Sequence, residues 1–273
     1  MHYVKNVPSR LIAAYQDFVE NHPPRLAAGV PVYDLGEGPA LIFLHGMAGD
    51  GSAWWQQLLH FQDRYRVLAP TYPETRDLVE LADRILAALH ELGVDRFAVV
   101  GSSLGGYLAQ FLTKIAPGRV EAAVFANTFP PNREIARRNR LRVALAQTLP
   151  EPVVRAAFLR YIERVLVPAG DNHALLRHYL VQNARKLKKR ELLARYRAVV
   201  TPFKPAPPKA PHLIVEATND PLIDERLRAI LRTTYPHAAR HVFEGGGHFP
   251  YLNRPKAYHA VLESFLENAG YAP

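Results

Sequence analysis

The sequence contains no cysteine among its 273 residues, so it can form neither a disulfide framework nor a thiolate metal site. It also lacks any apolar run that approaches the ~20 residues needed to span a bilayer. Residues 1–24 carry charges throughout and contain no apolar stretch typical of a secretory signal. Internal repeats and low-complexity tracts are absent as well. We therefore expect neither a disulfide-rich secreted protein nor an integral membrane protein, and the cytoplasm is the expected location.

The chain does contain enough apolar side chains for a sizeable core. Hydrophobic residues make up 48% of the sequence, which suits one large domain with an inserted subdomain. Apolar runs typical of strands alternate with helical patterns, and this alternation predicts an α/β fold with a mainly parallel, doubly wound sheet. Strands are expected at residues 30–35, 40–44, 65–69, 97–100, 122–126, 212–217 and 240–243, and helices at residues 11–19, 78–92, 105–115, 224–234 and 256–267.

A serine nucleophile is indicated where the apolar run at residues 97–100 leads into Gly-Ser-Ser-Leu-Gly. In the GxSxG pattern the glycines stand two residues before and after the serine, so the pattern selects Ser103 and not Ser102. Such glycines let the backbone turn sharply from a strand into a helix, and the turn exposes the serine hydroxyl. The alternative is a glycine-rich turn with an idle serine. The strand before the motif and the helical pattern after it favour the nucleophile.

The base and the acid of a triad follow in the expected chain order. His248 comes after a short strand and three glycines that can let it approach the nucleophile. Asp220 stands at the end of the 212–217 strand, where a carboxylate can orient the imidazole. Asp224 and Glu216 are better explained as a first-turn helix charge and a polar residue at a strand end. The other position for the acid, after the 122–126 strand, holds the uncharged Asn127.

An oxyanion hole is expected where the apolar strand at residues 40–44 ends in His-Gly. The backbone N–H groups of Met47 and Leu104 are the candidate donors, because main-chain donors near the nucleophile are rigid. His45 is then interpreted as a residue that shapes the loop and not as a base. The wider pocket is expected to include His45, Gly46, Trp54, Tyr72, Phe129 and Phe249.

These segments together resemble the α/β-hydrolase family over roughly residues 30–270. Within that family, Thr-Tyr-Pro at 71–73, the GSSLGGYLAQ segment at 101–110, Asn-Thr-Phe at 127–129 and GGGHFPYL at 245–252 are similar to segments of maspardin-like proteins. The protein that gives this group its name has Asn at the position of His248 and lacks the His-Gly of the oxyanion loop. The noncatalytic adaptor role known in that group is therefore not transferred to this chain.

Residues 130–205 interrupt the alternation with helical patterns and are flanked by prolines. They are expected to form a helical cap over the site, inserted into a core made of residues 1–129 and 206–273. The segment contains 17 Lys and Arg but only 5 Asp and Glu, whereas the whole chain has a net charge of +9. A solvated helical face explains this excess, and attraction of an anionic substrate, membrane surface or protein partner is the alternative. Nucleic-acid binding is not expected, because no recognition motif accompanies the charge.

The sequence thus predicts a serine hydrolase that cleaves small-molecule carboxylic esters through an acyl-enzyme, with Ser103, His248 and Asp220 as its triad. The mechanism needs no cofactor or metal. Peptidase, thioesterase and C–C hydrolase activities use the same triad and remain open. Dehalogenase and epoxide hydrolase activities are disfavoured, because they need a carboxylate at the position of Ser103. A maspardin-like interaction protein is the alternative from another class, and the sequence does not indicate an oligomeric state.

Overall fold

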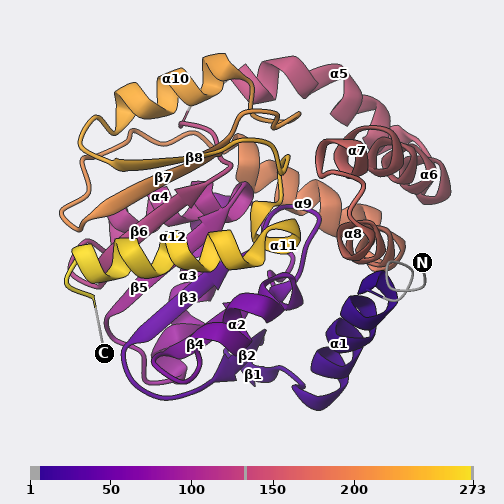
Figure 1. The fold of residues 1–273 in the computed structure, drawn as a ribbon. Coiled ribbons are helices and arrows are strands. Elements are labelled where there is room, and N and C mark those ends of the chain that lie inside the picture. The colour runs from indigo at the N-terminus through magenta and orange to yellow at the C-terminus, as the bar shows by residue number, and fades with distance from the viewer. Residues whose placement is uncertain (1–6, 132–133, 272–273) are drawn as a thin grey trace.

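The computed structural model describes residues 7–131 and 134–271, which form an eight-stranded sheet covered by helices (Figure 1). The strand order is β1-β2-β4-β3-β5-β6-β7-β8. The pairs β1/β2 and β2/β4 are antiparallel, and the pairs from β4/β3 to β7/β8 are parallel. The strands are β1 (Arg25–Ala27), β2 (Val30–Leu35), β3 (Ala40–Leu44), β4 (Arg66–Pro70), β5 (Phe97–Ser102), β6 (Val120–Ala126), β7 (His212–Ala217) and β8 (Ala239–Phe243).

Helices cover both faces of the sheet because its inner strands are apolar on both sides. Along β3, Leu41 and Phe43 belong to one hydrophobic core, and Ile42 and Leu44 belong to the core on the opposite face. The first core is closed by η1 (Gly51–Trp54), α1 (Val7–Asn21), α2 (Trp55–Phe61), α11 (Pro250–Asn253) and α12 (Pro255–Asn268). The second is closed by α3 (Leu78–Glu91), α4 (Leu104–Ile115) and α10 (Glu225–Thr234). The predicted doubly wound α/β architecture is therefore confirmed.

Local sequence signals set several helix boundaries. The side chain of Asp77 accepts a hydrogen bond from the N–H of Glu80 at 2.9 Å and so caps the start of α3. Asp224 caps α10 in the same way, through the N–H of Leu227 at 3.0 Å. The helix α12 begins with Pro255, whose missing N–H costs nothing in a first turn. These residues fix where the helices start and therefore where the preceding loops end.

The described residues between β6 and β7 contain helices and no strand, and these helices are called here the cap helices. These helices are α5 (Glu134–Thr148), α6 (Glu151–Tyr161), the π-helical turn η2 (Ile162–Leu166), α7 (Val167–Ala169), α8 (Ala174–Lys186) and α9 (Lys189–Val200). Figure 1 shows them grouped at one end of the sheet, with α1 beside α8. The ring of Tyr15 on α1 packs edge-on against Tyr179 on α8 at 5.9 Å, so the N-terminal helix supports this group.

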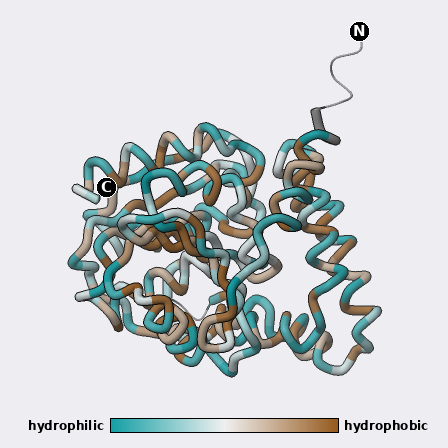
Figure 2. Tube along the Cα trace, turned by 90° about the horizontal axis from the view of Figure 1, so that it is seen from below, coloured by the Kyte–Doolittle hydropathy of each residue, from teal (hydrophilic) through white to brown (hydrophobic). Residues whose placement is uncertain are grey.

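The hydropathy of the trace follows this layering. Figure 2 shows the hydrophobic stretches gathered towards the middle of the molecule, while the outer helices alternate between hydrophilic and hydrophobic residues. None of the helices in the described part of the chain has both the length and the apolar character required to cross a bilayer.

Candidate active site

Ser103 occupies the sharp turn between β5 and α4. Its backbone has φ 57° and ψ −118°, a strained conformation that is uncommon for a residue with a side chain. The two glycines of the motif allow the close packing around this turn. A Cβ on Gly101 would lie 2.1 Å from the carbonyl oxygen of Gly105, and a Cβ on Gly105 would lie 2.0 Å from that of Leu44. The turn therefore presents the Ser103 side chain, which is partly exposed, at the carboxyl end of the sheet.

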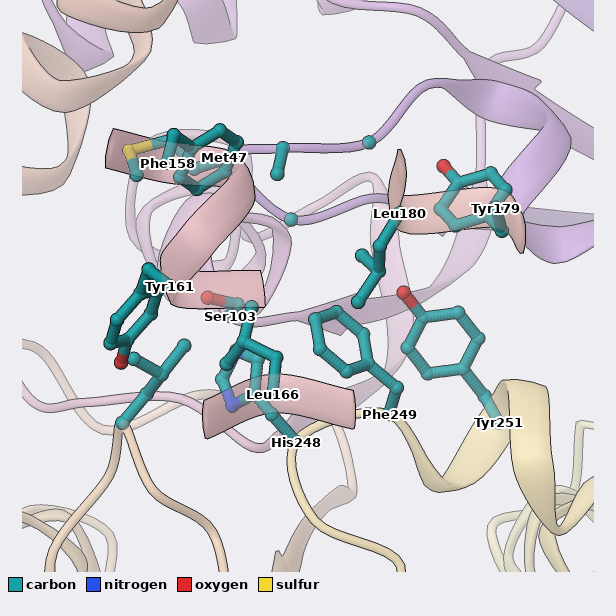
Figure 3. Close-up of a pocket in the computed structure, with 14 residues that line it drawn as sticks. Met47, Ser103, Phe158, Tyr161, Leu166, Tyr179, Leu180, His248, Phe249 and Tyr251 are labelled. Carbon is teal, nitrogen blue, oxygen red and sulfur yellow. The ribbon is translucent and has the colours of Figure 1, made fainter. Parts of the chain in front are cut away.

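Asp220 and His248 lie in direct contact beside this turn. The Nδ1 atom of His248 is 2.8 Å from Oδ2 and 3.0 Å from Oδ1 of Asp220, and both residues are buried. Asp220 follows β7, and His248 follows β8 after Gly245, Gly246 and Gly247, all of which have positive φ. Ser103 and His248 line one cavity, and Figure 3 shows their side chains among those that surround it. The structure thus brings together the three predicted triad residues.

The Asp220 carboxylate receives hydrogen bonds from donors on every side. Oδ1 accepts the backbone N–H groups of Leu222 at 2.8 Å and Ile223 at 3.1 Å. Oδ2 accepts the side-chain amide of Asn127 at 3.0 Å. Asn127 has a positive φ of 43° at the end of β6, and its amide also reaches the carbonyl of Gly247 at 3.3 Å. From the sequence, Asn127 is expected only as an uncharged residue at the alternative acid position. Its contact with Asp220 was not predicted, although its place at the carboxyl end of a strand was the available signal.

Among the described residues, the other two carboxylates considered for the acid form no hydrogen bond with His248. Asp224 caps α10 and pairs with Arg138 at 2.7 Å. Glu216 is buried within β7, where its carboxylate pairs with Arg232 at 3.0 Å. Burial raises the pKa of Glu216, and the nearby arginines oppose that shift. Both residues therefore have structural partners of their own.

His45 shapes the loop that follows β3. Its ring is fully buried and stacks on Tyr72 at 3.7 Å, and the Tyr72 hydroxyl donates to the His45 carbonyl at 2.9 Å. Nδ1 of His45 lies 2.7 Å from the carbonyl oxygen of Gly46, so this nitrogen is assigned as the protonated one. Burial, followed by the charge of Arg195, lowers the pKa of His45 well below its usual value. Nε2 accepts the backbone N–H of Tyr72 at 3.3 Å, so both ring nitrogens are used in holding the loop.

The loop at residues 45–50, called here the oxyanion loop, packs closely against Ser103. A Cβ on Gly46 would lie 3.3 Å from the Cβ of Ser103. Leu104 is the first residue of α4, where N–H groups have no acceptor within the helix. Met47 lines the cavity together with Ser103. The predicted oxyanion donors thus lie on two segments that meet at the serine.

Two residues from the cap helices form hydrogen bonds with the backbone of the oxyanion loop. The guanidinium of Arg195 on α9 donates to the carbonyl oxygens of Met47 at 2.9 Å and Gly49 at 2.6 Å. Arg195 is only 6% exposed, and burial lowers its pKa while the charge of Asp50 opposes the shift. The hydroxyl of Tyr179 on α8 accepts the N–H of Asp50 at 3.0 Å. Neither contact was predicted, because each joins segments more than a hundred residues apart.

Comparison with known proteins agrees with this architecture. The family model described as the alpha/beta hydrolase family matches residues 41–261. The chain belongs to the alpha/beta hydrolase family. Maspardin from Danio rerio is 26% identical over 233 residues, which are 83% of this chain and 73% of maspardin. RutD from Cronobacter sakazakii, whose name proposes carbamate hydrolysis, is 26% identical over 264 residues, or 86% of this chain and 93% of RutD.

A solved structure supports the fold of this alpha/beta hydrolase family member. The enol-lactonase from Burkholderia xenovorans LB400 superposes with a TM-score of 0.70 at 20% identity, covering 90% of this chain and 100% of the enzyme. At that identity the likeness concerns the fold alone. The predicted resemblance to the family, including maspardin-like proteins, is confirmed.

Two cavities of this alpha/beta hydrolase family member meet at Ser103. The smaller has a volume of about 110 Å³ and includes Gly46, His248 and Phe249 in its lining. The larger has a volume of about 390 Å³, lies under α5 and α9, and includes Phe129. Three of the six predicted pocket residues, namely Gly46, Phe249 and Phe129, therefore line a cavity beside the serine.

The other three predicted pocket residues are placed differently. Trp54 is fully buried and stacks on Tyr251 at 4.1 Å, so it lies behind the wall of the small cavity. His45 and Tyr72 stack on each other beneath the oxyanion loop. None of the three is among the residues that line the two cavities at Ser103 in the described chain. Each packs its ring against another ring, so the apolar surface that suggested a pocket is used in the core.

Proposed function

We propose that this protein is a serine hydrolase that cleaves carboxylic esters through an acyl-enzyme. The observation that carries the proposal is the hydrogen bond between His248 and Asp220 at the cavity into which the strained turn presents Ser103. A serine hydroxyl is a weak nucleophile unless a base accepts its proton and fixed donors stabilise the oxyanion. Both kinds of group lie around Ser103. Membership of the alpha/beta hydrolase family agrees with this chemistry.

The proposed reaction has two halves that balance with one water molecule. His248 Nε2 accepts the proton of Ser103 as Oγ bonds to the acyl carbon, and the N–H groups of Met47 and Leu104 stabilise the oxyanion. The bond between the acyl carbon and the alkoxy oxygen then breaks, and His248 protonates the leaving alcohol. Water next attacks the acyl carbon while His248 accepts its proton. The carbon–Oγ bond breaks, the proton returns to Ser103, and the acid leaves.

Asp220 keeps His248 in the orientation that this scheme requires. Its hydrogen bond to Nδ1 leaves Nε2 free to face the serine, and its charge stabilises the imidazolium formed in each half. Asn127 and the N–H groups of Leu222 and Ile223 hold the carboxylate in place. We expect these three donors to keep the Asp220 carboxylate in one orientation during turnover.

Esters are not the only class of substrate that a serine nucleophile can attack, and experiment distinguishes between these classes. Peptides, thioesters, C–C bonds and the carbamates suggested by the name of RutD can all be attacked by such a serine. The alternative without enzymatic activity is a maspardin-like interaction protein. Epoxide hydrolysis is disfavoured because its nucleophile is a carboxylate, and Ser103 occupies that position.

The test combines a fluorophosphonate probe with a panel of esters, thioesters, anilides and carbamates. We expect the probe to label Ser103 and esters to give the highest kcat/KM. The substitution Ser103→Ala should remove labelling and lower kcat by about a million-fold, as typically found when a triad loses its nucleophile. A folded Ser103→Ala variant that keeps a tenth of the activity would contradict the nucleophile. Absence of both labelling and turnover in the wild type would favour the interaction protein.

A further inference from the structure

We propose that the substrate is an ester of a small alcohol with a larger, mainly apolar acyl group, and that the two cavities at Ser103 receive these two parts separately. This inference rests on the proposed serine hydrolase function. Ser103 lines both cavities, so a carbonyl carbon bonded to its Oγ has one substituent directed into each.

The proton path decides the assignment. His248 must protonate the leaving alkoxide, so the alkoxy oxygen has to lie within hydrogen-bond reach of its ring. His248 lines the smaller cavity and is absent from the lining of the larger one. The alcohol part therefore enters the smaller cavity and the acyl chain enters the larger. Met47 lines both, which agrees with a carbonyl oxygen held between them at the oxyanion loop.

The volume of the smaller cavity limits the alcohol. It measures about 110 Å³, and the side chains of Tyr179, Leu180, Phe249 and Tyr251 form part of its wall. A cavity of ~150 Å³ in another protein holds one benzene molecule, so this space fits an alcohol smaller than benzene. Figure 3 shows Leu180, Phe249 and Tyr251 grouped on one side of this space. Leu180 and Tyr251 are nearly fully buried, so the wall cannot recede without repacking the core.

The larger cavity suits an apolar chain. Its volume of about 390 Å³ falls in the ~300–1,000 Å³ range of small-molecule sites. Apolar side chains form most of its lining, including Ile135 and Val143 from α5 and Leu192 and Val199 from α9. Burying each methylene of an acyl chain there should raise kcat/KM, because apolar area leaves water. The substrate class is thus a short-alcohol ester of a medium-length or branched apolar acid.

Two isomeric esters test the assignment directly. Methyl octanoate and heptyl acetate have the same composition and similar leaving-group chemistry, but they place the long chain on opposite sides of the carbonyl. Acid release measured by pH-stat should give a kcat/KM at least tenfold higher for methyl octanoate. An equal value, a preference for heptyl acetate, or no turnover of either ester by enzyme that a fluorophosphonate labels would overturn the assignment. Absence of labelling would instead reject the proposed function.

Variants of helix α5 provide a matched pair. Ala146 lines the larger cavity, whereas Ala144 on the same helix is exposed to solvent. The substitution Ala146→Trp should lower the ratio of kcat/KM for methyl octanoate to that for methyl acetate by at least tenfold. The substitution Ala144→Trp should leave this ratio unchanged. If Ala146→Trp leaves the ratio at its wild-type value, the acyl chain does not occupy this cavity.

A second inference is carried by Arg195, which we assign as a positioning residue for the oxyanion loop. Its guanidinium bonds the carbonyls of both Met47 and Gly49 and is nearly excluded from water. Binding two carbonyls of one loop fixes the peptide planes between them and thus the path of the backbone that carries the Met47 N–H. Both hydrogen bonds come from one nitrogen, Nη1, whose two N–H groups have fixed directions in the guanidinium plane, whereas the three donors of a lysine ammonium rotate on a flexible stem.

The test compares Arg195→Lys with Arg197→Ala, since Arg197 is exposed on the same helix. Arg195→Lys should lower kcat at least tenfold per fluorophosphonate-titrated site, with KM changed less than threefold. Arg197→Ala should keep the wild-type kcat. If Arg195→Lys lowers only the melting temperature and keeps kcat per titrated site, Arg195 has a structural role alone and the assignment is wrong.

Discussion

Replacing Asp220 by asparagine should disturb more than the charge of the proposed triad. Each group that forms a hydrogen bond with the carboxylate is a donor. Oδ1 accepts the N–H groups of Leu222 and Ile223, and Oδ2 accepts the amide of Asn127 and His248 Nδ1. An asparagine amide places an NH₂ group at one of these two positions. In one orientation NH₂ faces two backbone N–H groups, and in the other it faces the Asn127 amide. Either way donors oppose donors, and each unsatisfied buried group costs about 1–3 kcal/mol.

We therefore expect Asp220→Asn to lower kcat by about ten-thousand-fold, as is typical when this substitution selects the wrong imidazole tautomer. The measurement is ester turnover per titrated site, with Asp224→Asn as the control because Asp224 only caps α10 and pairs with Arg138. The control should change kcat little. A larger loss in Asp224→Asn than in Asp220→Asn would move the acid to Asp224.

The contact with Asn127 allows a compensating substitution. In the double variant Asp220→Asn with Asn127→Asp, the NH₂ group of residue 220 can donate to the new carboxylate. The remaining amide oxygen then sits where Oδ1 accepts two backbone N–H groups and lies 3.0 Å from His248 Nδ1. We expect kcat to recover by roughly 10- to 100-fold over Asp220→Asn, since one to two matched hydrogen bonds are worth about 1.4–2.7 kcal/mol. Recovery stays partial because the new carboxylate also faces the Gly247 carbonyl. No recovery at all in a folded double variant would refute this account of how Asp220 is held.

Three further predictions concern the fold and the charge of the cap. Gly105→Ala should lower the free energy of unfolding in denaturant by at least ~3 kcal/mol, because its Cβ would lie 2.0 Å from the carbonyl oxygen of Leu44. An unchanged free energy of unfolding would show that the turn can relax. Burial, and then His60, lowers the pKa of His259 to about 4, so the unfolded chain binds more protons and stability is lost as the pH falls from 6.5 towards 4. His259→Gln should remove roughly 2 kcal/mol of that loss after allowance for solvent screening, and a melting curve with the wild-type pH dependence would contradict this. If the excess of basic residues in 130–205 attracts anionic esters, these esters should have a higher kcat/KM than matched neutral esters at low salt. This difference should disappear towards 1 M salt, where the Debye length is ~3 Å. The same salt dependence for both esters would favour the explanation that the basic residues form a solvated helical face.

Features set by short stretches of sequence could be predicted. The bounds of β3 agree with its apolar run, because every position of this strand is buried and none is polar. The bounds of β7 also agree with the prediction, although this strand contains the buried Glu216. The position of Ser103 in a strained turn between strand and helix follows from two glycines that no other residue can replace there. By contrast, the three-residue β1 has too few residues for a periodic signal and depends on pairing with β2.

Contacts between distant segments could not be predicted from local patterns. The Asn127–Asp220 pair joins residues 93 positions apart, and Arg195 reaches Met47 across 148 positions. In the sequence Arg195 is one basic residue among many in the cap. Its burial depends on how α9 packs over the oxyanion loop. Trp54 was predicted to line the pocket because it follows the oxyanion loop, but its ring turns to Tyr251 in the core.

The hydrogen bonds from Arg195 and Tyr179 to the oxyanion loop tie α8 and α9 to the rest of the protein more firmly than α5 and α6. A swing of α8 and α9 away from the sheet would break their hydrogen bonds to the loop and leave a buried cation without its partners, which is costly. No residue of α5 or α6 is buried, so displacing these two helices exposes far less apolar surface. Displacing α5 and α6 would therefore cost less than displacing α8 and α9, and it would leave the hydrogen bonds from Arg195 and Tyr179 to the oxyanion loop in place.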